Sequence, residues 1–256
     1  MKRLVLFVLS ILFAFSLVAC DGKDTVKFDK GSVKVIAHRG LSGLETENTE
    51  AAFIAAGERS YYGIEGDVRK TADGKFVMSH DESLERLFGM NINVESSTLD
   101  SIKSIASKDK RKNASICELD GYIAVCKTYN KQAFLELKSE FTEQEIAEII
   151  SIINSHGYIE SVVFISFSCE NLFLVRKRLP EHRVQLLCSE LDGIDIEKLI
   201  SERIDISVSY KKITKELVER FHSVGLSVGV WTVNSKSTAE NLVSLGVDYI
   251  TTNILE

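Results

Sequence analysis

The sequence lacks the cysteine pattern of a structural zinc site. Its five cysteines stand at positions 20, 117, 126, 169 and 188, and no two of them form a Cys-x-x-Cys pair. Cys169 and Cys188 lie in or beside apolar, strand-like runs, which predicts that both are core residues. Cys117 and Cys126 flank a helical pattern, too far apart along a helix to bridge directly. Whether any of these cysteines form disulfides is left open by the sequence.

Positive charge is also scarce. The formal net charge is −6, and loss of the two basic residues at positions 2 and 3 with a targeting segment would leave −8. Proteins that bind nucleic acid present a basic stripe to the phosphates, and none is visible here. The basic run at 108–112 is predicted to be a solvated loop rather than a phosphate- or membrane-binding segment. Nucleic acid is therefore excluded as a partner, and nothing indicates an obligate protein partner.

The N-terminus carries a short apolar run. Residues 4–19 are apolar apart from two serines and follow a short basic region. The run is too short for a comfortable transmembrane helix and is typical of a signal peptide. It ends in Val18-Ala19-Cys20, which resembles the bacterial lipobox, whose cysteine becomes the lipidated first residue of the mature protein. The alternative is an ordinary signal peptide that happens to precede a cysteine.

These observations predict how the N-terminal part is organised. We expect a lipoprotein signal peptide at 1–19 and a tether at 20–30 that begins with lipidated Cys20. The protein is then an exported bacterial lipoprotein, anchored to the cell envelope membrane on its periplasmic or extracellular face.

Short apolar runs recur along the remainder, with helical patterns between them. Several runs are almost continuously apolar, as strands buried on both faces are. We predict strands at 33–38, 63–68, 133–138, 162–167, 184–189, 205–210, 227–233 and 247–252. We predict helices at 49–59, 118–127, 142–155, 170–179, 214–224 and 237–245. Alternation of this kind indicates a parallel α/β fold, and eight such strands predict a (β/α)₈ TIM barrel.

One additional strand-like run, at 75–80, does not fit the alternation. Only the four residues 71–74 separate it from the second strand, and parallel partners need a dozen or more connecting residues. We therefore predict an antiparallel β-hairpin arm after strand 2, added to the eight barrel strands. No low-complexity linker interrupts residues 31–253, so a single catalytic barrel is predicted at 31–256.

Carboxylates stand where barrel enzymes keep their sites, at the C-terminal ends of strands. Glu65 and Asp67 are two apart in a strand and so project from the same face, and Glu136 lies at the end of another strand. Buried carboxylates side by side repel each other unless a cation neutralises them. Three carboxylates without a thiolate predict a hard divalent cation, Ca²⁺ or Mg²⁺.

Cationic and imidazole side chains stand at the same predicted barrel end. Arg39 and Lys138 are suited to hold an anionic group such as phosphate. Phosphodiester cleavage needs one group that takes a proton and another that gives one, and His38 and His80 can do both near neutral pH. Either histidine alone would be read as an ordinary hydrogen-bonded residue, but their combination with the carboxylates favours catalysis.

Four sequence motifs carry a resemblance that covers residues 33–252. They are His38-Arg39-Gly40, Glu47-Asn48-Thr49-Glu50-Ala51-Ala52-Phe53, Ile64-Glu65-Gly66-Asp67-Val68-Arg69-Lys70-Thr71-Ala72-Asp73-Gly74, and His80-Asp81-Glu82-Ser83-Leu84-Glu85-Arg86. In order and spacing they resemble the glycerophosphodiester phosphodiesterase family, of the phospholipase-C-like phosphodiesterase type. Leu135-Glu136-Leu137-Lys138, Ile165-Ser166-Phe167 and Trp231-Thr232-Val233-Asn234 also look like that family's downstream motifs.

The resemblance implies a distorted barrel that hydrolyses glycerophosphodiesters, such as glycerophosphocholine or glycerophosphoethanolamine, to sn-glycerol 3-phosphate and an alcohol. It implies that Glu65, Asp67 and Glu136 bind the metal, that His38 and His80 are the acid–base pair, and that Arg39 and Lys138 hold phosphate. Two alternatives stay open, a lysophospholipase D-like enzyme and a catalytically inactive lipoprotein that only binds ligand.

The chain departs from the family pattern at several positions. Thr46 replaces a proline, and Gly66 replaces an apolar residue and should face away from the site. Leu87-Phe88 stands where the family usually has Thr-Thr, and Thr252-Asn253 where it usually has Thr-Asp; these positions are expected near the barrel mouth, where they bear on alcohol specificity. Trp231 is predicted either to wall the glycerol pocket or to belong to the core.

Overall fold

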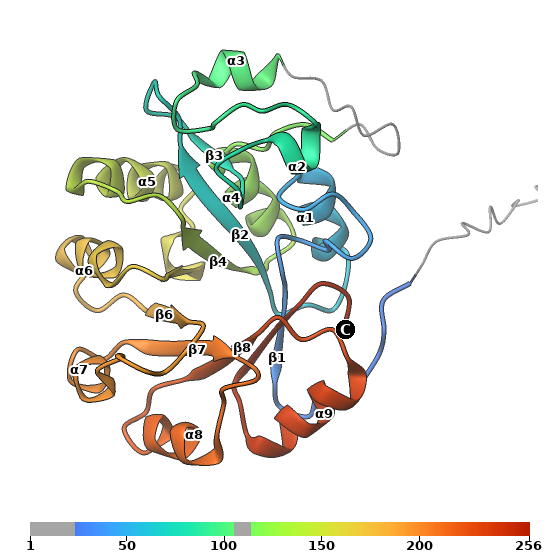
Figure 1. The fold of residues 1–256 in the computed structure, drawn as a ribbon, viewed down its shortest axis with the longest axis vertical. Coiled ribbons are helices and arrows are strands. Elements are labelled where there is room, and N and C mark those ends of the chain that lie inside the picture. Colours follow the sequence, from blue (N-terminus) through green and yellow to red (C-terminus); the bar gives the residue numbers. More distant parts are fainter. Residues whose placement is uncertain (1–23, 105–113) are drawn as a thin grey trace, which may run out of the picture.

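The architecture is a closed barrel, as Figure 1 shows for the computed structural model. It describes residues 24–104 and 114–256, so the signal peptide, Cys20 and the basic run at 108–112 lie outside the described residues. Eight strands are parallel, and the pairing of the first with the second closes the sheet. They are β1 (Lys34–Ala37), β2 (Gly63–Lys70), β4 (Gln132–Leu137), β5 (Val162–Ser166), β6 (Val184–Cys188), β7 (Asp205–Ser209), β8 (Val228–Trp231) and β9 (Tyr249–Thr252). The predicted (β/α)₈ barrel is confirmed.

The hairpin arm lies outside the barrel count. β3 (Phe76–Met78) pairs antiparallel with β2, with Val68 opposite Met78. The turn between the strands contains Gly74 at φ 70°, a left-handed conformation that glycine adopts without steric cost. β2 therefore has barrel partners along one part of its length and the arm beside its end, which brings His80 to the mouth of the barrel.

Helices cover the outside of the barrel (Figure 1). The longer ones match predicted segments: α1 (Glu50–Gly57), α4 (Leu119–Thr128), α5 (Glu143–Ser155), α6 (Cys169–Arg178), α8 (Lys215–His222) and α9 (Lys236–Leu245). α5 begins with a capping box in which the Thr142 hydroxyl accepts from the Glu145 backbone N–H. Among the described residues, no helix is long and apolar enough to cross a membrane.

Short helices were not predicted. They are α2 (Glu85–Phe88), α3 (Leu99–Lys103), α7 (Ile196–Ser201) and the 3₁₀ turn η1 (Ile159–Ser161). Segments of three to six residues complete too few turns to show a helical period, so their sequences carry little signal.

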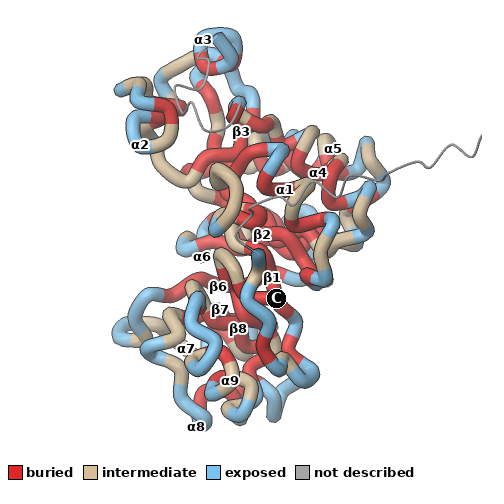
Figure 2. The backbone as a smooth tube through the Cα atoms, turned by 90° about the vertical axis from the view of Figure 1, so that its right-hand side faces the viewer, coloured by how far each residue is buried: buried red, intermediate tan, exposed pale blue. Residues whose placement is uncertain are grey.

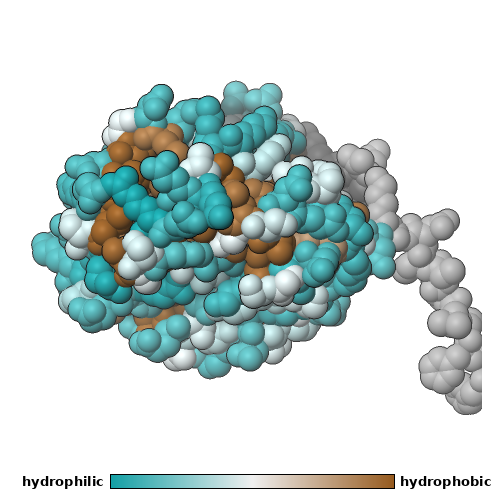
Figure 3. All heavy atoms as spheres, turned by 90° about the horizontal axis from the view of Figure 1, so that it is seen from below, coloured by the Kyte–Doolittle hydropathy of each residue, from teal (hydrophilic) through white to brown (hydrophobic). Residues whose placement is uncertain are grey.

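Two apolar layers hold the fold together. The main core lies between the strands and the helices, where Figure 2 shows the buried backbone and Phe53, Tyr122 and Phe164 are fully buried. A smaller core inside the barrel contains Ile36, Phe134, Val163 and Tyr249. On the face seen in Figure 3, hydrophilic residues dominate and hydrophobic ones reach the surface only in patches. The barrel interior is thus filled beneath its mouth.

The described cysteines are all free. Cys188 is buried, as predicted. The prediction for Cys169 is wrong, because it is exposed at the start of α6. The apolar run at 162–167 ends before this position, so proximity to a strand did not make Cys169 a core residue.

Candidate active site

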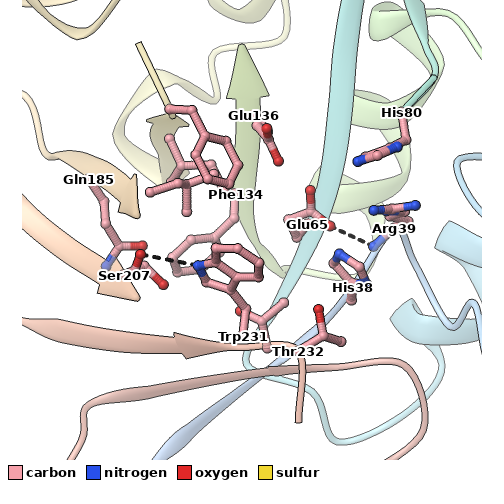
Figure 4. A pocket seen from close by; sticks show the side chains of 14 residues that line it. His38, Arg39, Glu65, His80, Phe134, Glu136, Gln185, Ser207, Trp231 and Thr232 are labelled. Atoms are coloured by element: carbon pink, nitrogen blue, oxygen red, sulfur yellow. Dashed lines mark hydrogen bonds between the residues drawn. The ribbon is translucent and has the colours of Figure 1, made fainter. Parts of the chain in front are cut away.

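The sequence-predicted site residues meet at one end of the barrel. His38 follows β1, Glu65 and Asp67 stand in β2, and Glu136 stands in β4. One pocket is lined by His38, Arg39, Glu65, His80, Glu136 and Trp231, together with apolar residues. Figure 4 shows the two histidines, Arg39 and the carboxylates on one side of this pocket and Trp231 on another. The barrel register accounts for the gathering, because adjacent parallel strands end at the same edge.

Three carboxylates converge beside the pocket. Glu65, Asp67 and Glu136 each offer an oxygen, and these oxygens all lie within 4.8 Å of one another. The pairing of β2 with β4 sets Asp67 directly beside Glu136. Glu65 Oε1 and Asp67 Oδ1 are buried and have no hydrogen-bond partner among the described residues. Unpaired buried oxygens are costly, and an all-oxygen donor set suits a hard cation. The residues therefore fit a divalent cation.

The charges of this triad point the same way. Burial, with the nearby Asp67 and Glu136, raises the pKa of Glu65 well above its usual value. Burial and Asp67 raise the pKa of Glu136 to about 8. Burial also acts to raise the pKa of Asp67, but Arg39 and Lys138 outweigh it, so that pKa is lowered. These shifts favour the ionised form of Asp67 and the neutral forms of Glu65 and Glu136, and a nearby positive charge would favour ionisation of all three.

Arg39 is fixed by its backbone as well as by its side chain. Its backbone N–H donates to Glu65 Oε2 at 2.6 Å, and Nη1 donates to Glu47 Oε1 at 2.7 Å. Its Nε lies 3.4 Å from Asp67 Oδ2. Arg39 has φ 56°, a left-handed conformation that is uncommon for residues other than glycine and is concentrated at functional sites.

Asn48 holds Asp67 through two hydrogen bonds, a role that the sequence did not reveal. Asn48 Nδ2 donates to Asp67 Oδ2 at 2.7 Å, and the Asp67 backbone N–H donates to Asn48 Oδ1 at 3.1 Å. Asn48 is buried and has φ 56°, which asparagine tolerates better than most residues. One bond holds the Oδ2 atom and the other holds the backbone of Asp67, which leaves Oδ1 without a hydrogen-bond partner among the described residues.

Lys138 faces the same carboxylates from β4's end. Its Nζ lies 2.9 Å from Glu136 Oε1 and 3.9 Å from Asp67 Oδ1. The ammonium also lies 5.7 Å from the centre of the Phe167 ring. Arg39 and Lys138 thus place one positive charge near each carboxylate oxygen of Asp67.

The two histidines have different partners. His38 Nδ1 lies 2.7 Å from Asn253 Oδ1, a neutral amide oxygen. His80 Nδ1 lies 2.7 Å from Asp81 Oδ1, a carboxylate oxygen. Burial and Arg39 lower the pKa of His38 to about 4, and burial also lowers the pKa of His80. His38 is therefore neutral near pH 7, and at His80 the nearby carboxylates of Asp67 and Asp81 offset only part of the effect of burial on the pKa.

Trp231 forms part of the pocket wall and also contacts the inner core. Its Nε1–H donates to the Ser207 backbone oxygen at 3.1 Å, the bond drawn in Figure 4. Its ring meets the Phe167 ring edge-on at 5.5 Å. Phe167 is 48% exposed, which makes it the aromatic residue at the rim.

Polar residues at the inner end of the pocket were missed by the sequence analysis. Gln185 in β6 and Ser207 in β7 line the pocket and are buried. The available signal was a polar residue within an apolar strand, as in Val184-Gln185-Leu186. A single polar residue of this kind does not indicate a binding site until the structure shows which residues of the neighbouring strands lie beside it.

Two departures from the family pattern have a structural outcome. A Cβ at Gly66 would lie 2.8 Å from Met78 Cε, so Gly66 faces the arm and not the triad, as predicted. Leu87 and Phe88 are not among the residues that line the pocket, and their bearing on specificity stays a prediction. Phe88 is 2% exposed in a third, small apolar cluster with Leu84 and Val77, and Leu87 packs against it.

Comparison with known proteins decides the family. The model of the glycerophosphoryl diester phosphodiesterase family matches residues 38–256. The chain belongs to this family. As a glycerophosphodiester phosphodiesterase it is a phosphoric diester hydrolase.

Relatives of this phosphodiesterase cover nearly its whole length. A glycerophosphodiester phosphodiesterase of Caldanaerobacter subterraneus subsp. tengcongensis is 33% identical, over 86% of this chain and 93% of its own. One from Bacillus subtilis is 28% identical, over 98% and 94%. A solved Oleispira antarctica phosphodiesterase, in complex with the product sn-glycerol-3-phosphate, superposes with a TM-score of 0.80 at 26% identity and covers 86% of this chain and 92% of its own.

Metal binding should stabilise the fold through the triad. We expect Ca²⁺ or Mg²⁺, added to chelator-treated protein at about 100 times its dissociation constant, to raise the free energy of unfolding by about 2.7 kcal/mol. Glu65→Gln should remove most of this increment. The raised pKa of Glu65 costs stability near neutral pH, and glutamine has no such cost, so the stability of the variant in chelator should equal or exceed that of the wild type. Urea denaturation with and without metal measures both quantities.

Glu140→Gln is the matched control, since Glu140 is an exposed carboxylate two residues beyond Lys138. It should keep the full metal-dependent increment. Equal increments in Glu65→Gln and wild type would show that the triad does not hold the cation.

Proposed function

We propose that this enzyme hydrolyses glycerophosphodiesters of small alcohols, such as glycerophosphocholine and glycerophosphoethanolamine, and releases sn-glycerol 3-phosphate. The observation that carries the proposal is a single pocket lined by both histidines, Arg39, Glu65 and Glu136, with a polar inner end. The solved Oleispira antarctica relative, which holds sn-glycerol-3-phosphate, supports the same product for this chain.

The closed inner end of the pocket favours the glyceryl group over an acyl chain. Gln185 and Ser207 face the pocket there, and the inner core around Phe134 and Tyr249 fills the barrel beneath. Neither the Gln185 Oε1 atom nor the Ser207 hydroxyl has a hydrogen bond within the described part of the chain. Free polar groups of this kind suit the hydroxyls of glycerol, whereas an acyl chain would leave them unpaired.

His38 is proposed as the general base. The Asn253 amide oxygen can only accept, so we assign the proton to His38 Nδ1, which leaves Nε2 unprotonated. A neutral imidazole with a free Nε2 can take the proton of the glycerol 2-hydroxyl.

His80 is proposed as the general acid. Asp81 accepts from its Nδ1 and stabilises the charged imidazolium, whose Nε2 proton can pass to the leaving alcohol. As the 2-hydroxyl oxygen bonds to phosphorus, the bond from phosphorus to the leaving oxygen breaks. The product is a cyclic phosphate, which water opens with the two histidines in exchanged roles.

The cationic side chains are proposed to hold the phosphate. Arg39 and Lys138 neutralise its oxygens and orient it between the histidines. Glu65, Asp67 and Glu136 would hold a divalent cation, Ca²⁺ or Mg²⁺, which would stabilise the negative charge that develops on the phosphate.

We also propose that the enzyme works at a membrane. The lipobox-like Val18-Ala19-Cys20 supports export and a lipid anchor at Cys20 on the cell envelope. Glycerophosphodiesters are deacylated phospholipids, so an anchored enzyme would lie close to the source of its substrate.

Release of sn-glycerol 3-phosphate tests the activity. We expect turnover of glycerophosphocholine with Ca²⁺ or Mg²⁺, a loss of at least about 100-fold in chelator, and recovery when metal returns. Lysophosphatidylcholine should be a poor substrate. The reverse preference would favour a lysophospholipase D-like enzyme, and binding without turnover of either would favour an inactive lipoprotein. Unchanged activity in chelator would refute the metal assignment.

A substrate with a more acidic leaving group separates the roles of the histidines. His80→Ala should lose about 10²- to 10⁴-fold with glycerophosphocholine but much less with the p-nitrophenyl ester of glycerol phosphate, because a nitrophenolate leaves without protonation. His38→Ala should lose activity on both, because the base is still needed. Equal losses of His80→Ala on the two esters would count against the assignment.

Asn253→Asp tests the base through its pH dependence. His38 must be neutral to act, and its low pKa keeps it neutral down to about pH 4. A carboxylate at position 253 favours the imidazolium and so raises that pKa by about one unit or more. The acid limb of kcat/KM at saturating metal should therefore move to higher pH, with the alkaline limb in place. An acid limb that stays, or moves to lower pH, would exclude His38 as the base.

A further inference from the structure

Arg86 links two arms of the active site without entering the pocket. It lies on α2, and its Nε donates to Asp81 Oδ2 at 2.5 Å. Its two terminal nitrogens donate to Glu47, Nη2 to Oε1 at 2.7 Å and Nη1 to Oε2 at 3.0 Å. One guanidinium therefore bridges two carboxylates that are 34 positions apart in the sequence.

Each of these carboxylates also contacts an active-site cation or imidazole. Glu47 accepts from Arg39 Nη1, and Asp81 accepts from His80 Nδ1, both at 2.7 Å. The contacts form one continuous chain, Arg39–Glu47–Arg86–Asp81–His80. Arg39 and His80 come from different elements, the end of β1 and the end of the hairpin arm, so this chain joins two parts that could otherwise shift independently.

Each link is more than an ordinary surface ion pair. The Glu47 and Asp81 side chains are 15% and 31% exposed, and the Arg86 contact to Glu47 is bidentate. Bidentate guanidinium–carboxylate pairs fix orientation as well as charge, and a network fixes geometry better than isolated pairs.

The short helix that carries Arg86 has its own support. Leu84 and Phe88, on either side of Arg86, are buried in the third apolar cluster with Val77 of β3. Gly89 ends the helix at φ 67°, in the left-handed region. Hydrophobic packing thus holds α2 on the arm while Arg86 reaches across the mouth to Glu47.

We propose that Arg86 is a positioning residue that sets the phosphate-binding Arg39 and the acid His80 at a fixed separation. This inference rests on the proposed function of the pocket. In-line displacement needs the phosphate oxygens and the proton donor in one alignment, and small misplacements are costly. Loss of the bridge should leave both side chains present but misaligned.

Arg86→Gln tests the proposal. We expect kcat on glycerophosphocholine to fall by about 10- to 100-fold, with a much smaller change in KM and an unchanged thermal midpoint. Guanidinium ion at a low, non-denaturing concentration should restore part of kcat. The Arg86 side chain is 48% exposed, so the ion can reach its position, and the two carboxylates there accept hydrogen bonds from a planar guanidinium group. Methylammonium should restore none, and Arg86→Lys should recover only part, since an ammonium cannot serve both carboxylates in the same geometry.

Coupling to the partners sharpens the test. Arg86→Gln combined with Asp81→Asn should lose little more than the larger single loss, because both break the same chain. Arg220→Gln is the control. Arg220 is a similarly exposed arginine that pairs with Glu197 on the outside of the barrel, and its loss should leave kcat unchanged.

Wild-type kinetics in Arg86→Gln would overturn the proposal. So would a loss of activity that follows a loss of folded protein and is not restored by guanidinium, since Arg86 would then act only on stability. Failure of the proposed function is a separate result, because the wild type itself would then turn over no glycerophosphodiester.

Discussion

Repulsion among three buried carboxylates is the constraint on which this active site depends. Glu65, Asp67 and Glu136 are held with oxygens within 4.8 Å by strand pairing that the whole barrel enforces. Arg39 and Lys138 offset part of the charge, and Asn48 and the Arg39 backbone N–H satisfy single oxygens. Two buried oxygens remain without a hydrogen-bond partner among the described residues, and such oxygens suit a hard cation. The barrel thus concentrates uncompensated carboxylate oxygens at the site where we propose that phosphate binds.

Beside these carboxylates, the two histidines differ in the residue that accepts a hydrogen bond from each ring. Asn253 gives His38 an acceptor without charge, and Asp81 gives His80 one with charge. These different neighbours support the base proposed at His38 and the acid proposed at His80. The proposed direction of the reaction across the pocket therefore follows from the hydrogen-bond partner of each histidine.

Much of this could be predicted because it depends on local pattern. Apolar runs separated by helical segments predict the barrel, and two carboxylates two apart in a strand share a face. Contacts that close over long separations could not be predicted. His38 and Asn253 are 215 residues apart, and the Arg86 bridge depends on a four-residue helix with no detectable period. The burial of Phe88 could not be predicted for a related reason, since only tertiary packing shows that it belongs to the third apolar cluster.

The start of the described chain has a mechanical consequence. Val26 pairs with Leu255, its N–H donating to Ile254 and its carbonyl accepting from Glu256, while Lys27 pairs with the Glu256 carboxylate. Position 26 is therefore fastened to the barrel wall. If Cys20 carried a lipid, six residues would connect it to position 26, a distance of at most about 20 Å when fully extended. A segment of that length would keep position 26 within about 20 Å of the lipidated residue, so the barrel would stay close to the membrane surface.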